Sequence, residues 1–68
     1  MNMPISKQAA RRILKSAGAD RINDEAAMEF SEAMNKLAYD VAKKAVKLAS
    51  HAKRATVRKE DVELALKD

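Results

Sequence analysis

Cysteine is absent from this sequence, and histidine occurs only once, as His51. Without cysteine the chain can form no disulfide and no thiolate metal site, which is consistent with a reducing compartment. A single histidine without a second histidine or a cysteine nearby does not make a typical zinc site. We therefore expect no metal and no cofactor.

Glycine is nearly absent as well, since the chain has one. A glycine-rich loop that cradles phosphates is therefore excluded. Catalysis usually needs a nucleophile beside a base, paired carboxylates in a pocket, or a metal, and so short a chain seldom encloses a pocket. His51 fits a helix-end or interface residue better than a catalytic base. We expect that the protein is not an enzyme.

Long apolar runs are missing, because no stretch approaches the roughly 20 residues that a membrane-spanning helix needs. The opening residues, MNMPISKQAARR, also lack the apolar core of a signal peptide. We expect a soluble, cytoplasmic protein without a membrane partner.

Aromatic residues are scarce, with only Phe30 and Tyr39 present. Proteins that bind single strands need exposed aromatic platforms on which bases stack. No predicted helix gathers arginine, asparagine and glutamine on one face, and the central helix is too long for a helix-turn-helix. These features disfavour a module that reads nucleic-acid sequence.

The main feature that is present is a stretch from Asp24 to His51 without glycine or proline and rich in alanine, the best helix former. Its apolar residues recur in steps of three and four, which predicts one wide helix face. They are Ala27, Phe30, Met34, Leu37, Val41, Ala45 and Leu48. Such a helix is about 42 Å long, too long for a compact chain of this size to cover. A second copy of the chain is the simplest cover.

Capping signals divide the rest of the chain. Ser6 is a good N-cap for a first helix, Gly18 stands where that helix ends with positive φ, and Asn23 caps the long helix. A third apolar pattern follows a second loop. The chain is expected to be all-α and a single domain, 1–68, with helices over about 6–17, 24–52 and 59–67.

Charge is distributed unevenly along the chain, whose net charge is +4 and whose pI is near 9.6. The first 18 residues contain four basic side chains and no acidic one. A pI above about 9, with cations in loops and near helix N-termini, favours a protein that binds the duplex backbone. An ordinary solvated surface is the alternative interpretation.

Taken together, several segments resemble the archaeal histones over essentially the whole chain. They are PI at 4–5, RILK at 12–15, AGADR at 17–21, KLASHAKRATV at 47–57 and EDVELA at 60–65. The resemblance implies the histone fold, a short helix–loop–long helix–loop–short helix that pairs head to tail as an intertwined homodimer. Dimers of this family bend, wrap and compact double-stranded DNA without reading bases, as chromatin or nucleoid proteins.

The resemblance also implies roles for individual residues. Arg12 corresponds to the arginine that enters the minor groove, and Arg21 pairs with Thr56 across the dimer. Arg54 corresponds to a loop arginine that pairs with Asp61. The expected DNA-binding residues are Arg12, Lys15, Arg21, Asn23, Lys53, Arg54, Thr56 and Arg58.

Leu48, His51 and Asp61 correspond to the face through which dimers of the family join. His51 is expected to hydrogen-bond Asp61 of a neighbouring dimer, giving tetramers or longer arrays on DNA. Two departures from the family are evident. The second loop reads K-R-A-T at 53–56 where the family often has G-R-K-T. At Glu32 and Lys36 members of the family often have a side chain of the opposite charge, and this difference disfavours tight stacking of successive turns of a wrapped array.

Two functions follow from these patterns. The favoured one is an archaeal chromatin protein whose partners are DNA and itself. The other is a histone-fold interaction module that pairs with a different histone-fold chain.

Overall fold

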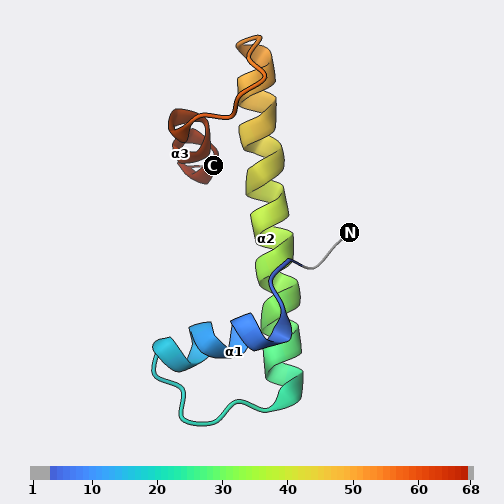
Figure 1. Cartoon of the computed structure of the whole chain (residues 1–68), viewed down its shortest axis with the longest axis vertical. Coiled ribbons are helices and arrows are strands. Elements are labelled where there is room, and N and C mark those ends of the chain that lie inside the picture. Colours follow the sequence, from blue (N-terminus) through green and yellow to red (C-terminus); the bar gives the residue numbers. More distant parts are fainter. Residues whose placement is uncertain (1–3, 68) are drawn as a thin grey trace. The chain divides into compact units, whose positions relative to one another are not determined.

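The computed structural model describes residues 4–67, which contain three helices and no strand. The helices are α1 (Lys7–Ser16), α2 (Asp24–His51) and α3 (Lys59–Lys67), as Figure 1 shows. The predicted all-α class and the order short, long, short are confirmed. None of the described helices is long and apolar enough to cross a membrane.

Helix α1 is held at both ends by the residues expected there. The Ser6 hydroxyl accepts a hydrogen bond from the Ala9 N–H, which satisfies a donor that the first turn leaves free. At the other end Gly18 has φ +113°, and its N–H donates to the Lys15 carbonyl at 3.0 Å. The Ala19 N–H donates to the Leu14 carbonyl, which completes a Schellman motif.

Helix α2 begins as predicted and ends in the same motif with a different residue. The Asn23 side-chain oxygen accepts a hydrogen bond of 2.8 Å from the Ala26 N–H, and acidic residues fill the first turn, where they suit the helix dipole. At the C-terminal end the left-handed position is occupied by Lys53, with φ 59°. Glycine is the usual residue at this position because it has no Cβ.

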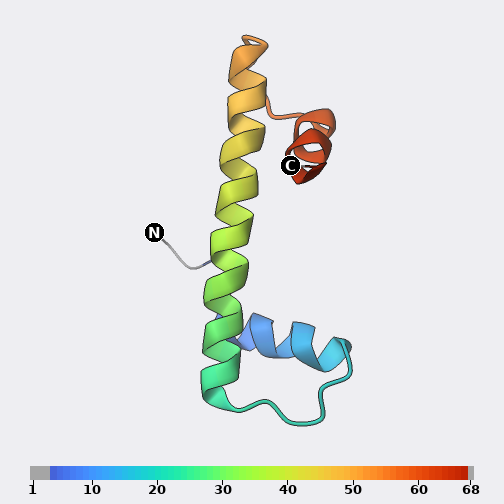
Figure 2. The ribbon, with the colours of Figure 1, turned by 180° about the vertical axis from the view of Figure 1, so that it is seen from behind.

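The chain divides within α2, between Lys36 and Leu37, into two compact units. In the first unit α1 lies beside the first part of α2 (Figure 1). In the second unit α3 lies beside the last part of α2, which Figure 2 shows from behind.

The interior of each unit is built from small side chains. Every buried apolar residue in the described range is an alanine, at most 3% exposed: Ala10, Ala27, Ala45, Ala49 and Ala65. By contrast, Leu37 is 60% exposed, Val46 57% and Leu66 65%. Full burial of one such side chain stabilises a protein by about 1.5–3 kcal/mol. The single chain thus leaves much of its apolar stabilisation unused.

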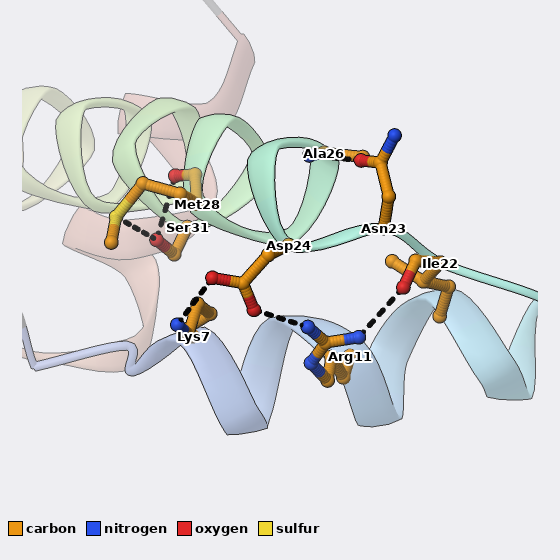
Figure 3. Close-up of polar contacts among 8 residues, drawn as sticks. All are labelled: Lys7, Arg11, Ile22, Asn23, Asp24, Ala26, Met28 and Ser31. Carbon is orange, nitrogen blue, oxygen red and sulfur yellow. Dashed lines mark hydrogen bonds and ion pairs between the residues drawn. The ribbon is translucent and has the colours of Figure 1, made fainter.

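Polar residues take the remaining interior positions of the first unit. Ser31 is fully buried, and its hydroxyl donates to the Met28 carbonyl at 2.8 Å (Figure 3). Asn35 is 3% exposed and contacts the segment before α1. Its Oδ1 accepts from the Ile5 N–H and its Nδ2 donates to the Ile5 carbonyl, both at 2.9 Å. Asn35 therefore satisfies both backbone groups of Ile5, a role that the sequence did not suggest.

Replacing Asn35 with alanine should destabilise the protein by about 1–3 kcal/mol, because the Ile5 N–H and C=O lose their partner in a partly buried place. Urea denaturation at a fixed protein concentration measures the effect. The conservative variant Asn35→Asp keeps the acceptor but not the donor, so its free energy of unfolding should lie between those of the natural protein and of Asn35→Ala. A free energy of unfolding unchanged in Asn35→Ala would show that water replaces these bonds at no cost.

Candidate nucleic-acid interface

Two of the four cations of the basic N-terminal segment are bound inside the chain. Lys7 Nζ lies 2.8 Å from one Asp24 carboxylate oxygen, and Arg11 binds the other (Figure 3). A second Arg11 nitrogen donates to the Ile22 carbonyl at 2.7 Å. Hydrogen bonds from Lys7 and then Arg11 lower the pKa of Asp24. These two cations therefore brace the start of α2 against α1 in the first unit.

The other two cations of α1 are exposed but differ in their contacts. Lys15 Nζ donates to the Asp20 carbonyl at 3.0 Å and so supports the first loop. Arg12 is exposed and has no ion pair or side-chain hydrogen bond among residues 4–67. Within α1, Arg12 is thus the exposed cation without an internal partner, whereas Lys15 keeps its charge and further N–H donors for an external anion.

The first loop, residues 17–23, places Arg21 on the surface. No ion pair of the described chain includes Arg21. Asn23 already uses its side-chain oxygen to cap α2, so only its amide NH₂ remains for a phosphate. The contact expected between Arg21 and Thr56 involves two chains, and it stays a prediction.

The second loop is ordered by a paired charge. Arg54 donates to both oxygens of Asp61 at 2.9 Å, and its Nη1 also donates to the Thr56 carbonyl at 3.0 Å. The Arg58 N–H donates to Asp61 at 2.8 Å, and Asp61 is only 5% exposed. The pair predicted between Arg54 and Asp61 is confirmed.

These contacts shift both pKa values in the direction that favours the ion pair. Hydrogen bonds from Arg54 and from the Arg58 N–H lower the pKa of Asp61 to about 2. The bond to Asp61 raises the pKa of Arg54. The Arg54 side chain therefore mainly fixes the shape of the loop and of the first turn of α3.

Around this pair the loop presents exposed residues. Lys53, Thr56 and Arg58 are exposed, and neither Lys53 nor Arg58 forms a side-chain ion pair among residues 4–67. The loop thus has an internally neutralised centre and free cations on its surface. Such an arrangement suits contacts to phosphate groups, which position a protein on a duplex.

The residues expected to join dimers lie at the C-terminal part of α2 and on α3. Leu48 is half-buried and His51 is exposed. Together with Leu64 and Ala65 they line a surface hollow of about 450 Å³. Asp61 does not line this hollow, and its carboxylate is already bound by Arg54. The assembly role of these residues stays a prediction.

Among residues 4–67 no group of three or more histidine, cysteine, aspartate or glutamate side chains is placed to hold a metal ion.

A long helix flanked by two short ones, with two cation-bearing loops and a surface of unburied apolar side chains, is the arrangement expected of a histone-fold chain. Comparison with known proteins agrees. Residues 1–66 match the family described as histone-like transcription factor (CBF/NF-Y) and archaeal histone. The chain belongs to this family.

Two curated relatives place it further within the family. The chain is 52% identical over 56 residues to "Probable archaeal histone 3" of Methanocaldococcus jannaschii, covering 82% of this chain and 84% of the relative. It is 45% identical over 56 residues, with the same coverage, to one of the subunits of the archaeal histone HAN1 of Thermococcus zilligii.

The Arg54–Asp61 pair makes the stability of the protein sensitive to acid. The pKa of Asp61 is about 2 in the folded chain, below the ordinary value of 3.8. The unfolded chain therefore binds the proton more readily, and the stabilisation, complete above about pH 4, is lost as the pH falls towards 2. Thermal melting from neutral pH to pH 2 should show this loss in the natural protein.

In Asp61→Asn the melting temperature should be lower at neutral pH and should change less between pH 4 and pH 2. Asp24→Asn is the matched control for a second carboxylate with a lowered pKa, and it should leave the Asp61 component in place. If the melting temperatures of the natural protein and of Asp61→Asn changed in parallel with pH, the acid sensitivity would not come from Asp61.

Proposed function

We propose that this protein binds double-stranded DNA without sequence preference and, as a homodimer, bends, wraps and compacts it as archaeal chromatin. Family membership and two relatives named archaeal histones support the proposal. The single observation that carries the dimer is the exposure of large apolar side chains over an interior whose buried apolar residues are all alanines.

The dimer follows from what the apolar surface needs. A second copy brings an identical set of exposed leucine and valine side chains, so a two-fold arrangement buries both sets at once. Head-to-tail pairing of the long helices then completes one histone-fold domain from the two units of each chain. Small domains commonly gain stability in this way.

Four of the residues that the family resemblance implicates in DNA binding are cations without an internal partner. Arg12 on α1, Arg21 in the first loop, and Lys53 and Arg58 in the second are exposed and outside the observed ion pairs. Pairing doubles this set. In this proposal Arg12 enters the minor groove, and the loop cations, with the Asn23 amide, contact phosphates.

Supporting roles fall to the cations that are already bound. Lys15 and Arg54 hold the two loops in shape through the Asp20 carbonyl and Asp61, and they add positive potential beside the DNA. Thr56 orients Arg21 of the second chain. Leu48 and His51, with Asp61 of the neighbouring dimer as the hydrogen-bond partner of His51, form the face on which further dimers assemble, giving tetramers or longer arrays.

Disrupting the exposed apolar face should dissociate the dimer. Leu37→Glu places a charge where a 60% exposed leucine is to be buried in each copy. We expect self-association to weaken at least about a hundredfold, as judged by sedimentation equilibrium. Lys36→Gln is the control, because it changes the charge by the same amount at the neighbouring position and removes no apolar side chain.

Two results would contradict this prediction. Equal dimerisation of Leu37→Glu and the natural protein would show that this face is not the interface. A natural chain that stays a disordered monomer until another histone-fold protein is added would favour the alternative function, an interaction module with a different partner.

Removing the free cation of α1 should weaken DNA binding on every sequence alike. For Arg12→Ala we expect the slope of log affinity against log salt to become shallower by about 2 per dimer, since each chain loses one contact. Lys7→Ala is the matched control on the same helix, because Lys7 is already bound to Asp24. It should leave the slope unchanged.

Fluorescence anisotropy on several unrelated duplexes, each titrated with salt, measures both variants. A change in preference at one base pair would contradict backbone-led binding. An equal effect of Arg12→Ala and Lys7→Ala would show that only total charge matters.

A further inference from the structure

The end of α2 contains the one non-glycine residue with positive φ in the described chain, Lys53. Its N–H donates to the Ser50 carbonyl and the Arg54 N–H donates to the Ala49 carbonyl, both at 2.9 Å. These two bonds define a Schellman motif in which Lys53 holds the left-handed position.

The end of α1 provides an internal comparison. The same pair of hydrogen bonds is formed there, and the left-handed position is held by Gly18, with φ +113°. Glycine adopts this conformation readily, whereas a residue with a Cβ is strained in it. The chain thus uses the favourable residue at one helix end and an unfavourable one at the other.

No contact within the chain accounts for the lysine. Its side chain is exposed and forms no ion pair among residues 4–67. Asp61, the buried carboxylate that orders this loop, is bound to Arg54. Strained backbone positions of this kind cluster at functional sites, where the strain is retained for the sake of function.

We propose that Lys53 holds this position for the sake of DNA binding and at the expense of folding stability. Its ammonium group supplies a phosphate contact that the conformationally preferred glycine cannot supply. The inference rests on the proposed function, which already includes Lys53 among the DNA contacts. What is added is that stability and DNA affinity oppose each other at this residue.

Two variants separate backbone strain from charge. Lys53→Gly removes both, so its melting temperature should rise, by about 4 °C or more, while its DNA affinity falls and its salt slope becomes shallower by about 2 per dimer. Lys53→Ala removes the charge but keeps a Cβ in the left-handed position. It should lose DNA affinity to the same extent without the gain in melting temperature.

Lys53→Arg keeps the charge and the strain, so both its melting temperature and its salt slope should equal those of the natural protein. Melting is measured without DNA at one protein concentration, and affinity by anisotropy on a short duplex. A Lys53→Gly variant with the melting temperature of the natural protein would show that the left-handed backbone at Lys53 does not lower stability. A Lys53→Gly variant that binds DNA as tightly as the natural protein, with the same salt slope, would show that Lys53 does not contribute to DNA affinity.

Failure of this inference is distinguishable from failure of the proposed function. If the natural protein binds no duplex at low salt, the proposed function fails whatever the melting temperatures are. If the natural protein binds duplex and the Lys53 variants bind it equally well, only the inferred role of Lys53 fails.

Discussion

The exposure of large apolar side chains is the constraint on which the rest of the structure depends. Helix α2 is longer than two short helices can cover, and the chain buries alanines while leaving Leu37, Val46 and Leu66 largely in water. Small interior residues let the short helices approach α2 closely, but they contribute little hydrophobic stabilisation each. In the proposed dimer a second copy supplies the missing burial, and the same pairing sets the cations of two chains on one body.

Within each chain, carboxylates decide which cations are free. Asp24 takes up Lys7 and Arg11, and Asp61 takes up Arg54, so these three side chains fix loops and helix ends. Arg12, Arg21, Lys53 and Arg58 have no such partner in the described range. The net charge of +4 therefore does not show which cations are bound inside the chain and which are available to a partner.

The sequence predicts the local features well, because their causes are local. Ser6, Gly18 and Asn23 act through neighbours three to five residues away, and each was placed correctly. The roles of Asp24 and Asn35 were not predicted, since their partners are 13 to 30 residues distant and depend on how α1 packs. The Arg54–Asp61 pair was expected from the family resemblance alone. The left-handed backbone at Lys53 was also missed, since lysine gives no signal for it.

In the proposed dimer, folding and pairing are one event. The most direct measurement is the thermal melting of the helical circular dichroism signal over a wide range of protein concentrations, without DNA. If two chains complete each other, the melting temperature rises steadily with concentration and helical signal is lost on strong dilution. A melting temperature independent of concentration, with full helical signal at the lowest dilution, would mean that the single chain is sufficient and would contradict the account.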